Sequence, residues 1–206
     1  DNMDLALAKK IESDLMGKGG RFDFQQWLSA AHQCRTAKEK LLGDAKEEFI
    51  PITVLGKGKS VIGGAGKVDL SAGEIKDIII DGFFKKVEIN EDLQKGRVSG
   101  LQELGLPFES DPAVMKHLSS FLKRHAANKD LKQVTDKKSG LNIVRPDILL
   151  FNGGAFRSPV IMEHTAAIIR EWFSDSEWSL SVLENEQFEQ AVSIGAAYYG
   201  LVLRGK

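Results

Sequence analysis

The stretch DILLFNGGAFRSP, residues 147–159, decides how the C-terminal third of the chain folds. Its apolar run at 148–151 predicts a buried strand, which two adjacent glycines end. An arginine follows, and the serine and proline at 158–159 are favoured residues for the cap and first turn of a helix. The stretch therefore predicts a strand, a turn of bare backbone and a helix in direct succession.

Working outward, the final third alternates between strand and helix patterns. Strands are predicted at 147–151 and 178–183, and helices at 159–173 and 187–203. This alternation is typical of α/β proteins with parallel strands. The fold class predicted for this part is therefore α/β.

Gly153, Gly154 and Arg157 are the candidate ligand-binding residues of this turn. In open α/β sheets, ligands bind beyond the carboxyl ends of the strands, and glycine lets a ligand approach the backbone closely. The arginine side chain can lie across an aromatic ring or reach a phosphate. The alternative is a pair of glycines that merely ends a buried strand, beside a solvated arginine. Spacing alone leaves both interpretations open.

The first two thirds of the chain have a different pattern. Helical spacing of apolar residues predicts helices at 2–16 and 23–42, with Asp23 as the N-cap of the second. A glycine-rich hairpin is expected between strands near 49–55 and 67–70. Further predictions are a helix after Ser71 with Glu74 at capping-box spacing, a helix from Pro112, and a solvated loop over 126–142.

Composition bounds the class of protein. The 206 residues can form one domain or two small lobes, and the net charge of −1 argues against nucleic acid or an anionic membrane as a partner. No apolar run approaches the roughly 20 residues of a membrane span. The single cysteine, Cys34, fits a reducing compartment, so a cytoplasmic location is expected. The four histidines lack metal-ligand spacing, and no metal site is predicted.

Two other glycine-rich segments resemble fragments of a P-loop. Residues 56–60 read Gly-Lys-Gly-Lys-Ser, and residues 64–67 read Gly-Ala-Gly-Lys. A P-loop needs a further glycine five residues before its Gly-Lys-Ser/Thr, and that position holds Thr53. In the second segment Val68 follows the lysine and cannot bind magnesium. A glycine-rich hairpin is the better interpretation of both.

Two helical segments contain acidic residues of interest. Glu39 lies near the end of the second predicted helix, where a solvated face with charge pairs is the ordinary interpretation. Residues 186–197 predict a helix that opens with acidic residues, as the helix dipole favours. The small residues at 195–197 permit close packing against a neighbouring element.

Several of these segments, taken in order, resemble one family. Residues 152–159 are similar to the Gly-Gly-Ser-Thr-Arg-Ile-Pro adenosine motif of the heat-shock 70-kilodalton (DnaK-type) chaperones. Residues 189–197 resemble their Asp-Glu-Ala-Val-Ala-Tyr-Gly-Ala-Ala helix. Residues 35–39 resemble the helix that flanks adenine, and residues 1–4 resemble the segment after the second phosphate loop.

The resemblance implies part of an actin-like, ribonuclease H-like ATPase fold. Residues 1–144 would form an α+β outer lobe with a small antiparallel sheet, and residues 145–206 the α/β end of the inner lobe. Gly153, Gly154 and Arg157 would contact adenosine, Glu39 the adenine or ribose side, and Glu189 would also belong to the nucleotide site. The implied ligands of the intact parent are ATP or ADP with magnesium. Its implied partners are client proteins, co-chaperones and a nucleotide exchange factor.

The chain differs from the family motifs at several positions, and these differences bear on what is expected of its nucleotide site. Ala155 and Phe156 replace small hydroxyl residues, Leu42 replaces a lysine, and Glu189 replaces an aspartate. Neither glycine-rich phosphate loop is recognisable, so this chain is expected to be a fragment without catalytic residues of its own, inactive alone although its parent is an ATPase. The alternative is a stand-alone protein-interaction module that keeps the fold without binding nucleotide, since exchange factors dock on this outer lobe in the family. A sugar kinase, which shares the actin-like fold, would need a sugar-binding acid near the absent loops.

Overall fold

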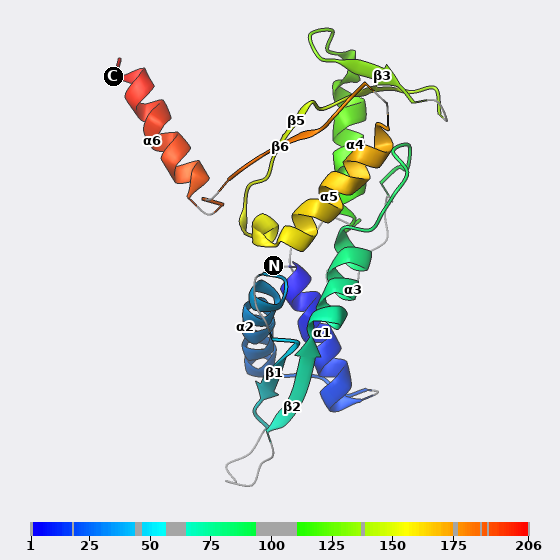
Figure 1. The fold of residues 1–206 in the computed structure, drawn as a ribbon. Helices are drawn as coiled ribbons and strands as arrows, with labels where there is room; N and C mark the ends of the chain where they lie inside the picture. Colours follow the sequence, from blue (N-terminus) through cyan, green and yellow to red (C-terminus); the bar gives the residue numbers. More distant parts are fainter. Residues whose placement is uncertain are drawn as a thin grey trace. The chain divides into compact units, whose positions relative to one another are not determined.

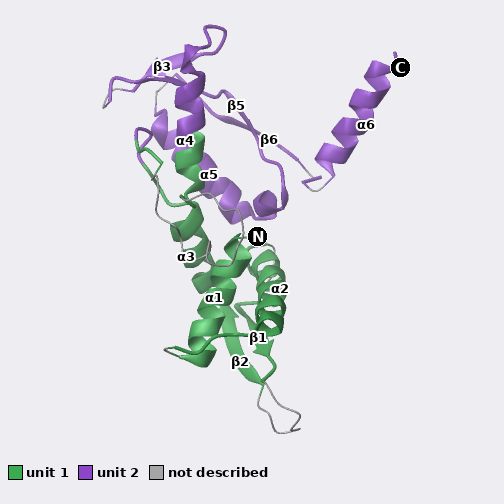
Figure 2. Cartoon of the chain, turned by 180° about the vertical axis from the view of Figure 1, so that it is seen from behind, with its two compact units in different colours: residues 1–87, 91–118 green, residues 88–90, 119–206 purple. Residues whose placement is uncertain are grey.

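The fold was analysed in a computed structural model, which describes residues 2–17, 19–43, 47–56, 65–93, 111–136, 139–174, 177–185, 187–188 and 190–205. The chain divides into two compact units (Figure 2). Unit 1 comprises 1–87 and 91–118, and unit 2 comprises 88–90 and 119–206. Helix and strand are mixed in both units, which agrees with the predicted α/β class. The division of an actin-like fold into lobes at 144 and 145 stays a prediction.

Unit 1 combines three helices with one hairpin (Figure 1). Its elements are α1 (Asn2–Met16), α2 (Phe24–Leu41), β1 (Phe49–Val54), β2 (Gly66–Ser71) and α3 (Ala72–Phe83). The strands are antiparallel, with Phe49 opposite Ser71 and Val54 opposite Gly66. All five elements lie close to their predicted positions, because each helix and strand shows its own period in the sequence.

The core of unit 1 gathers one apolar stripe from each element. The fully buried members are Leu7 and Ile11 of α1, Ala30, Cys34 and Ala37 of α2, Ile52 and Leu70 of the hairpin, and Ile75 and Ile79 of α3. The stripes on α2 and α3 match the sequence prediction. On α1 the buried stripe includes Asp4 and Glu12, two carboxylates that an apolar pattern does not select.

Both unexpected carboxylates of α1 have cationic or backbone partners. Asp4 forms an ion pair with Lys38 of α2 across 2.6 Å, and both side chains are at least nine-tenths buried. Glu12 pairs with Lys9 and accepts a hydrogen bond from the backbone N–H of Phe22 across 2.8 Å. Burial would raise the pKa of Glu12, but the hydrogen bonds from Lys9 and Phe22 lower it below the ordinary value. The pair of Asp4 with Lys38 thus joins α1 to α2, and the bond from Phe22 to Glu12 joins α1 to the segment that precedes α2.

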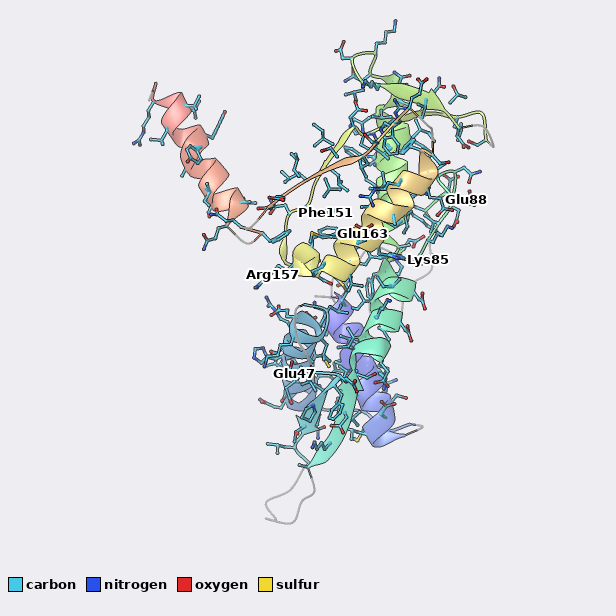
Figure 3. All side chains as sticks on the ribbon, in the orientation of Figure 1. Glu47, Lys85, Glu88, Phe151, Arg157 and Glu163 are labelled. Carbon is cyan, nitrogen blue, oxygen red and sulfur yellow. The ribbon has the colours of Figure 1, made fainter. Side chains whose placement is uncertain are left out.

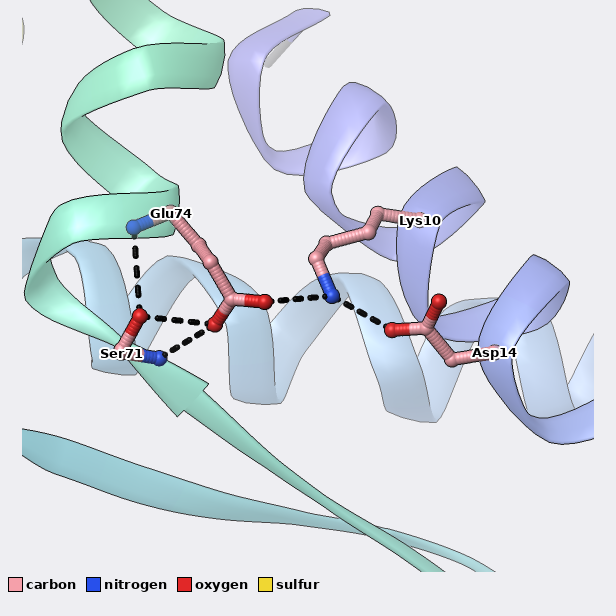
Figure 4. Close-up of polar contacts among 4 residues, drawn as sticks. All are labelled: Lys10, Asp14, Ser71 and Glu74. Atoms are coloured by element: carbon pink, nitrogen blue, oxygen red, sulfur yellow. Dashed lines mark hydrogen bonds and ion pairs between the residues drawn. The ribbon is translucent and has the colours of Figure 1, made fainter.

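The start of α3 is held by a capping box, as its spacing predicts (Figure 4). The Ser71 hydroxyl accepts a bond from the Glu74 N–H across 3.2 Å, and the Glu74 carboxylate accepts one from the Ser71 N–H across 2.9 Å. The other carboxylate oxygen of Glu74 pairs with Lys10 of α1 at 2.9 Å, and Lys10 also donates to Asp14. The bond from Lys10 and those from Ser71 lower the pKa of Glu74 to about 2. One carboxylate thus joins the cap of α3 to α1.

Unit 2 begins within α4 (Val114–Arg124), whose first residues belong to unit 1. The remaining elements are η2 (His125–Ala127), β3 (Gln133–Thr135), β4 (Asn142–Val144), β5 (Ile148–Leu150), η3 (Gly154–Arg157), α5 (Pro159–Trp172), β6 (Ser181–Leu183) and α6 (Ala191–Leu203). The apolar face that the sequence predicts for α4, formed by Val114, Leu118, Phe121 and Leu122, is partly wrong. Phe121 is half exposed and stacks on His125, while Met115 and Ser119 are fully buried.

The prediction of a solvated loop over 126–142 is also wrong in part. A short antiparallel hairpin pairs Gln133 with Val144 and Thr135 with Asn142. Its turn is closed by a hydrogen bond from the Gly140 N–H to the Asp136 carbonyl across 2.8 Å, with Gly140 at φ +69°. Strands of three residues are too short to leave a periodic signal in the sequence. The stretch is also rich in lysine and asparagine, which favours the interpretation of a loop.

Strands β5 and β6 pair in parallel, with Ile148 opposite Ser181 and Leu150 opposite Leu183. The parallel pairing confirms the strand–helix–strand prediction, since α5 provides the crossover that parallel strands require. The expectation of a buried strand is wrong within the described part of the chain. Ile148 is 60% exposed and Leu150 is 57% exposed.

Helix α6 buries no residue against the rest of the described chain. Its sequence is nevertheless almost wholly apolar, and Val192, Tyr198 and Leu203 are each at least 65% exposed. Among the helices that the structure describes, α6 included, none has both the length and the apolar character needed to cross a membrane.

The Glu74 capping box generates a stability prediction. Glu74→Gln should lower the free energy of unfolding by about 1 kcal/mol at pH 7, because it removes the charge that pairs with Lys10 and lies at the start of α3, while the glutamine oxygen can still accept the capping bond. Because the folded-state pKa of Glu74 is depressed to about 2, the stabilisation is present above its ordinary value of 4.5 and is lost as the pH falls toward 2. Urea unfolding of the two proteins should therefore differ most at neutral pH and converge in acid.

Asp77→Asn is the matched control, because it makes the same carboxylate-to-amide change at an exposed position of α3. It should leave the unfolding free energy unchanged to within about 0.5 kcal/mol. An equal loss in both variants would show that net charge, and not the local contacts of the Glu74 carboxylate, is responsible.

Candidate functional site

The turn at residues 151–158 connects the carboxyl end of β5 to α5. Gly153 has φ +89° and ψ 155°, a backbone conformation open essentially to glycine alone. Its N–H donates to the Asn152 side-chain oxygen at 2.9 Å and to the Phe188 carbonyl at 3.2 Å. The glycine is therefore required by the path of the chain, which spacing alone could not decide.

Gly154 has no such requirement. Its φ lies outside the left-handed region, and a Cβ built on it would meet no atom of the described residues within 4 Å. A Cβ on Gly153 would also enter open space. The backbone of both glycines is thus accessible on this side of the turn, as close approach by a ligand requires.

The residues after the glycines form the short helix η3 and then the cap of α5. The Phe156 ring packs on Phe151, with 4.8 Å between ring centroids, and Phe151 is buried. The Ile161 N–H donates to the Ser158 hydroxyl at 3.4 Å, and Pro159 occupies the first turn of α5. The predicted cap is confirmed. Phe156, which stands where the motif of the resembling family has a small hydroxyl residue, therefore packs on the buried Phe151 of the same turn.

Arg157 ends η3 and is exposed. Its side chain points outward from the turn, whereas Phe151 lies within unit 2 (Figure 3). The turn therefore presents bare backbone at Gly153 and Gly154 and a guanidinium three residues further on. A planar cation at this place can stack on an aromatic ring or bind an anionic oxygen.

Two asparagines that the sequence prediction missed help to hold this turn. Asn152 lies two residues beyond the last residue of β5, and Asn185 lies two residues beyond the last residue of β6. The Asn185 side chain donates to the Phe151 carbonyl at 2.9 Å. Two parallel strands that each end two residues before an asparagine are the signal that could have found the pair.

The remaining predicted site residues are Glu39 and Glu189. Glu39 is on α2 of unit 1, exposed, and forms an ion pair with Arg35 across 3.0 Å. Such a contact matches the ordinary interpretation of a solvated helical face. Glu189 lies outside the described residues, as do residues 57–64 of the two P-loop-like segments. The assignment of Glu39 and Glu189 to a nucleotide site stays a prediction.

The helix predicted from 187 begins only at Ala191, as α6. Its N-cap, Gln190, makes no side-chain capping bond, and its first turn holds no acidic residue, so the prediction of an acidic helix start is wrong. A Cβ on Gly195 would meet no atom of the described residues within 4 Å. The small residues at 195–197 thus pack against no described element.

Two kinds of chemistry have little support in the described parts of the chain. No three histidine, cysteine, aspartate or glutamate side chains are grouped there to hold a metal ion. Cys34 is fully buried, and burial, followed by the charge of Asp4, raises its pKa to about 12. A thiol with so high a pKa holds almost no thiolate at neutral pH and is a poor nucleophile.

Comparison with known proteins adds no assignment. No protein-family model matches the chain, and no curated protein matches it.

The two glycines should respond differently to a side chain. Gly153→Ala should lower the free energy of unfolding by about 1–3 kcal/mol, because alanine is strained at φ +89°. Gly154→Val should melt cooperatively within a few degrees of the wild type, because its side chain enters open space. Calorimetric melting of both variants checks this. Equal destabilisation would mean that the turn packs more tightly around Gly154 than its geometry indicates.

Proposed function

We propose that this chain contributes the adenosine-binding half of the ATPase domain of a chaperone related to the heat-shock 70-kilodalton family. The observation that carries the proposal is the turn at 151–158. A parallel strand ends there in accessible glycine backbone, followed by an exposed arginine and a capped helix. That arrangement suits a nucleoside whose ring lies against backbone and under a guanidinium.

The exposed apolar surfaces of unit 2 support the idea of an incomplete domain. Parallel strands normally lie in sheets that are covered on both faces. Here the pair of β5 and β6 leaves Ile148, Leu150 and Leu183 each at least 46% exposed. Helix α6 likewise buries no residue. These surfaces are the kind that a larger α/β domain covers with further strands and helices.

The described residues fit the adenosine of the implied ligand better than its magnesium ion. The backbone of Gly153 and Gly154 would hold the adenosine, and Arg157 would stack on the base. The role of Glu39 on the adenine or ribose side rests on the resemblance alone. Magnesium has no group of ligands in the described residues, so its binding is assigned to the rest of the parent domain. ATP supplies the phosphoryl group that the parent transfers to water. The role of this chain in that reaction is to bind and orient the nucleoside.

A second candidate function is a protein-interaction module without nucleotide. Large apolar side chains are exposed on unit 1, namely Phe24, Leu28 and Leu55, which are 79%, 61% and 75% exposed. Exposed apolar side chains of this size are common at protein–protein contacts. This candidate requires no contact between Arg157 and a ligand, which separates the two proposals experimentally.

Arg157→Ala tests the first proposal in the protein that joins this chain to its phosphate-binding half. Loss of the stacking should weaken ATP binding by about 1–2 kcal/mol, or roughly tenfold in Kd. Isothermal titration calorimetry measures the change. Arg170→Ala is the control, because Arg170 is an exposed arginine of α5 paired with Glu163 and lies outside the turn. Equal affinities for the two variants would remove Arg157 from the site and favour the interaction module.

The chain by itself should fold and show no ATP turnover. Phosphoryl transfer depends on loops, metal and cations that stabilise the transferred group, and the proposal places these in the other half. A phosphate-release assay on the purified chain should match a Glu39→Ala/Arg157→Ala double variant. Release above that control would show that this chain contains catalytic groups.

A further inference from the structure

The outer edge of β1 is occupied by side chains of α2. Strand β1 pairs with β2 on one side, and alternate residues direct their backbone groups toward β2 or away from it. Thr53 belongs to the second set, because both its N–H and its C=O bond to the side chain of Gln33. The same alternation places the backbone groups of Pro51 and Leu55 on this outer edge.

Gln33 reproduces the contacts of a neighbouring strand. Its Nε2 donates to the Thr53 carbonyl at 2.8 Å, and its Oε1 accepts from the Thr53 N–H at 3.0 Å. Two antiparallel strands exchange the same pair of bonds at each hydrogen-bonded position. The Gln33 Nε2 also donates to the Ser29 hydroxyl at 3.1 Å, which fixes the orientation of the amide.

The positions on either side of Thr53 are also blocked. The Gln26 side chain donates to the Leu55 carbonyl at 2.8 Å. Pro51 has no N–H, and its place on the outer edge explains why a proline is tolerated inside a strand. Two glutamine amides and one proline thus take up successive outward-facing positions of β1.

The sequence of β1 explains why such blocking is needed. Edge strands are ordinarily protected by charged side chains or by proline, and Phe-Ile-Pro-Ile-Thr-Val at 49–54 carries no charge and a single proline. The backbone groups that Pro51 does not block belong to β-branched and aromatic residues suited to strand pairing, so they could bond to a copy of the same strand. No charge repulsion opposes such pairing, and a two-fold axis through Thr53 would let the two Thr53 residues exchange both of their bonds.

We propose that Gln33 keeps the outer edge of β1 closed against antiparallel pairing with β1 of a second copy of this chain. The amide occupies the bonds on which that pairing depends, so that the strand remains an internal element of unit 1. This role is independent of nucleotide binding and involves no residue of the turn at 151–158.

Gln33→Ala in the 206-residue chain tests the proposal, with Gln25→Ala as the matched control at an exposed position of α2. At a protein concentration low enough to keep Gln33→Ala monomeric, hydrogen exchange of the Thr53 amide, followed by NMR, should become at least tenfold faster in Gln33→Ala and stay unchanged in Gln25→Ala. Light scattering coupled to size exclusion should show a dimer of Gln33→Ala that grows with concentration. Adding Thr53→Pro, which removes the outward N–H, should restore the monomer.

Gln33→Met keeps the length of the side chain without its amide and should behave like Gln33→Ala, so the test does not depend on one variant folding. The proposal is overturned if Thr53 exchanges at the control rate in both Gln33 variants while they are monomeric. It is also overturned if both remain monomeric at every concentration, or if Thr53→Pro leaves their dimers intact.

Discussion

The parallel pairing of β5 with β6 is the constraint on which the arrangement of unit 2 depends. Two parallel strands cannot be joined by a tight turn, so the chain must leave β5, cross over as a helix and return. Helix α5 makes that crossing, and the turn at 151–158 has to redirect the chain into it. The same constraint brings the carboxyl ends of both strands to one edge, where Asn152 and Asn185 follow them at equal spacing. The candidate site is thus a consequence of strand direction.

Unit 1 depends on polar contacts to orient α2, whose buried face consists mostly of small residues. Its second helix buries alanines and a cysteine, which give few directional contacts. The pair of Asp4 with Lys38 joins α1 to α2, and the pair of Lys10 with Glu74 joins α1 to the start of α3. A buried ion pair adds little net stability, but removing one partner leaves an uncompensated charge. The pair of Asp4 with Lys38 is buried, so an arrangement of α1 and α2 that separated these two side chains would be disfavoured.

The elements of unit 1 and the start of α5 could be predicted because their signals are local. Helices α2, α3 and α5 are capped by Asp23, Ser71 and Ser158. Each cap side chain accepts a hydrogen bond from the backbone N–H three residues later, so the spacing is visible in the sequence. The hairpin of β3 and β4 could not be predicted, because strands of three residues are too short for a period. The bond from the Phe22 N–H to Glu12 could not be predicted either, since this N–H reaches the carboxylate only after the chain has turned.

For the candidate site, spacing identified the turn but could not assign a reason to each glycine. The backbone angles separate them, since Gly153 is required by the chain path and Gly154 is not. A glycine that neither backbone geometry nor internal packing requires is available for contact with something outside the described chain. The exposed apolar faces of β5, β6 and α6 have the same character, because each carries side chains suited to burial that the described residues leave uncovered. Both features lie in unit 2, whereas the exposed apolar side chains of α2 and β1 lie in unit 1. An interaction module confined to unit 1 would explain only the exposed side chains of unit 1, whereas the proposed nucleotide-binding half-domain would explain both the turn and the uncovered sheet.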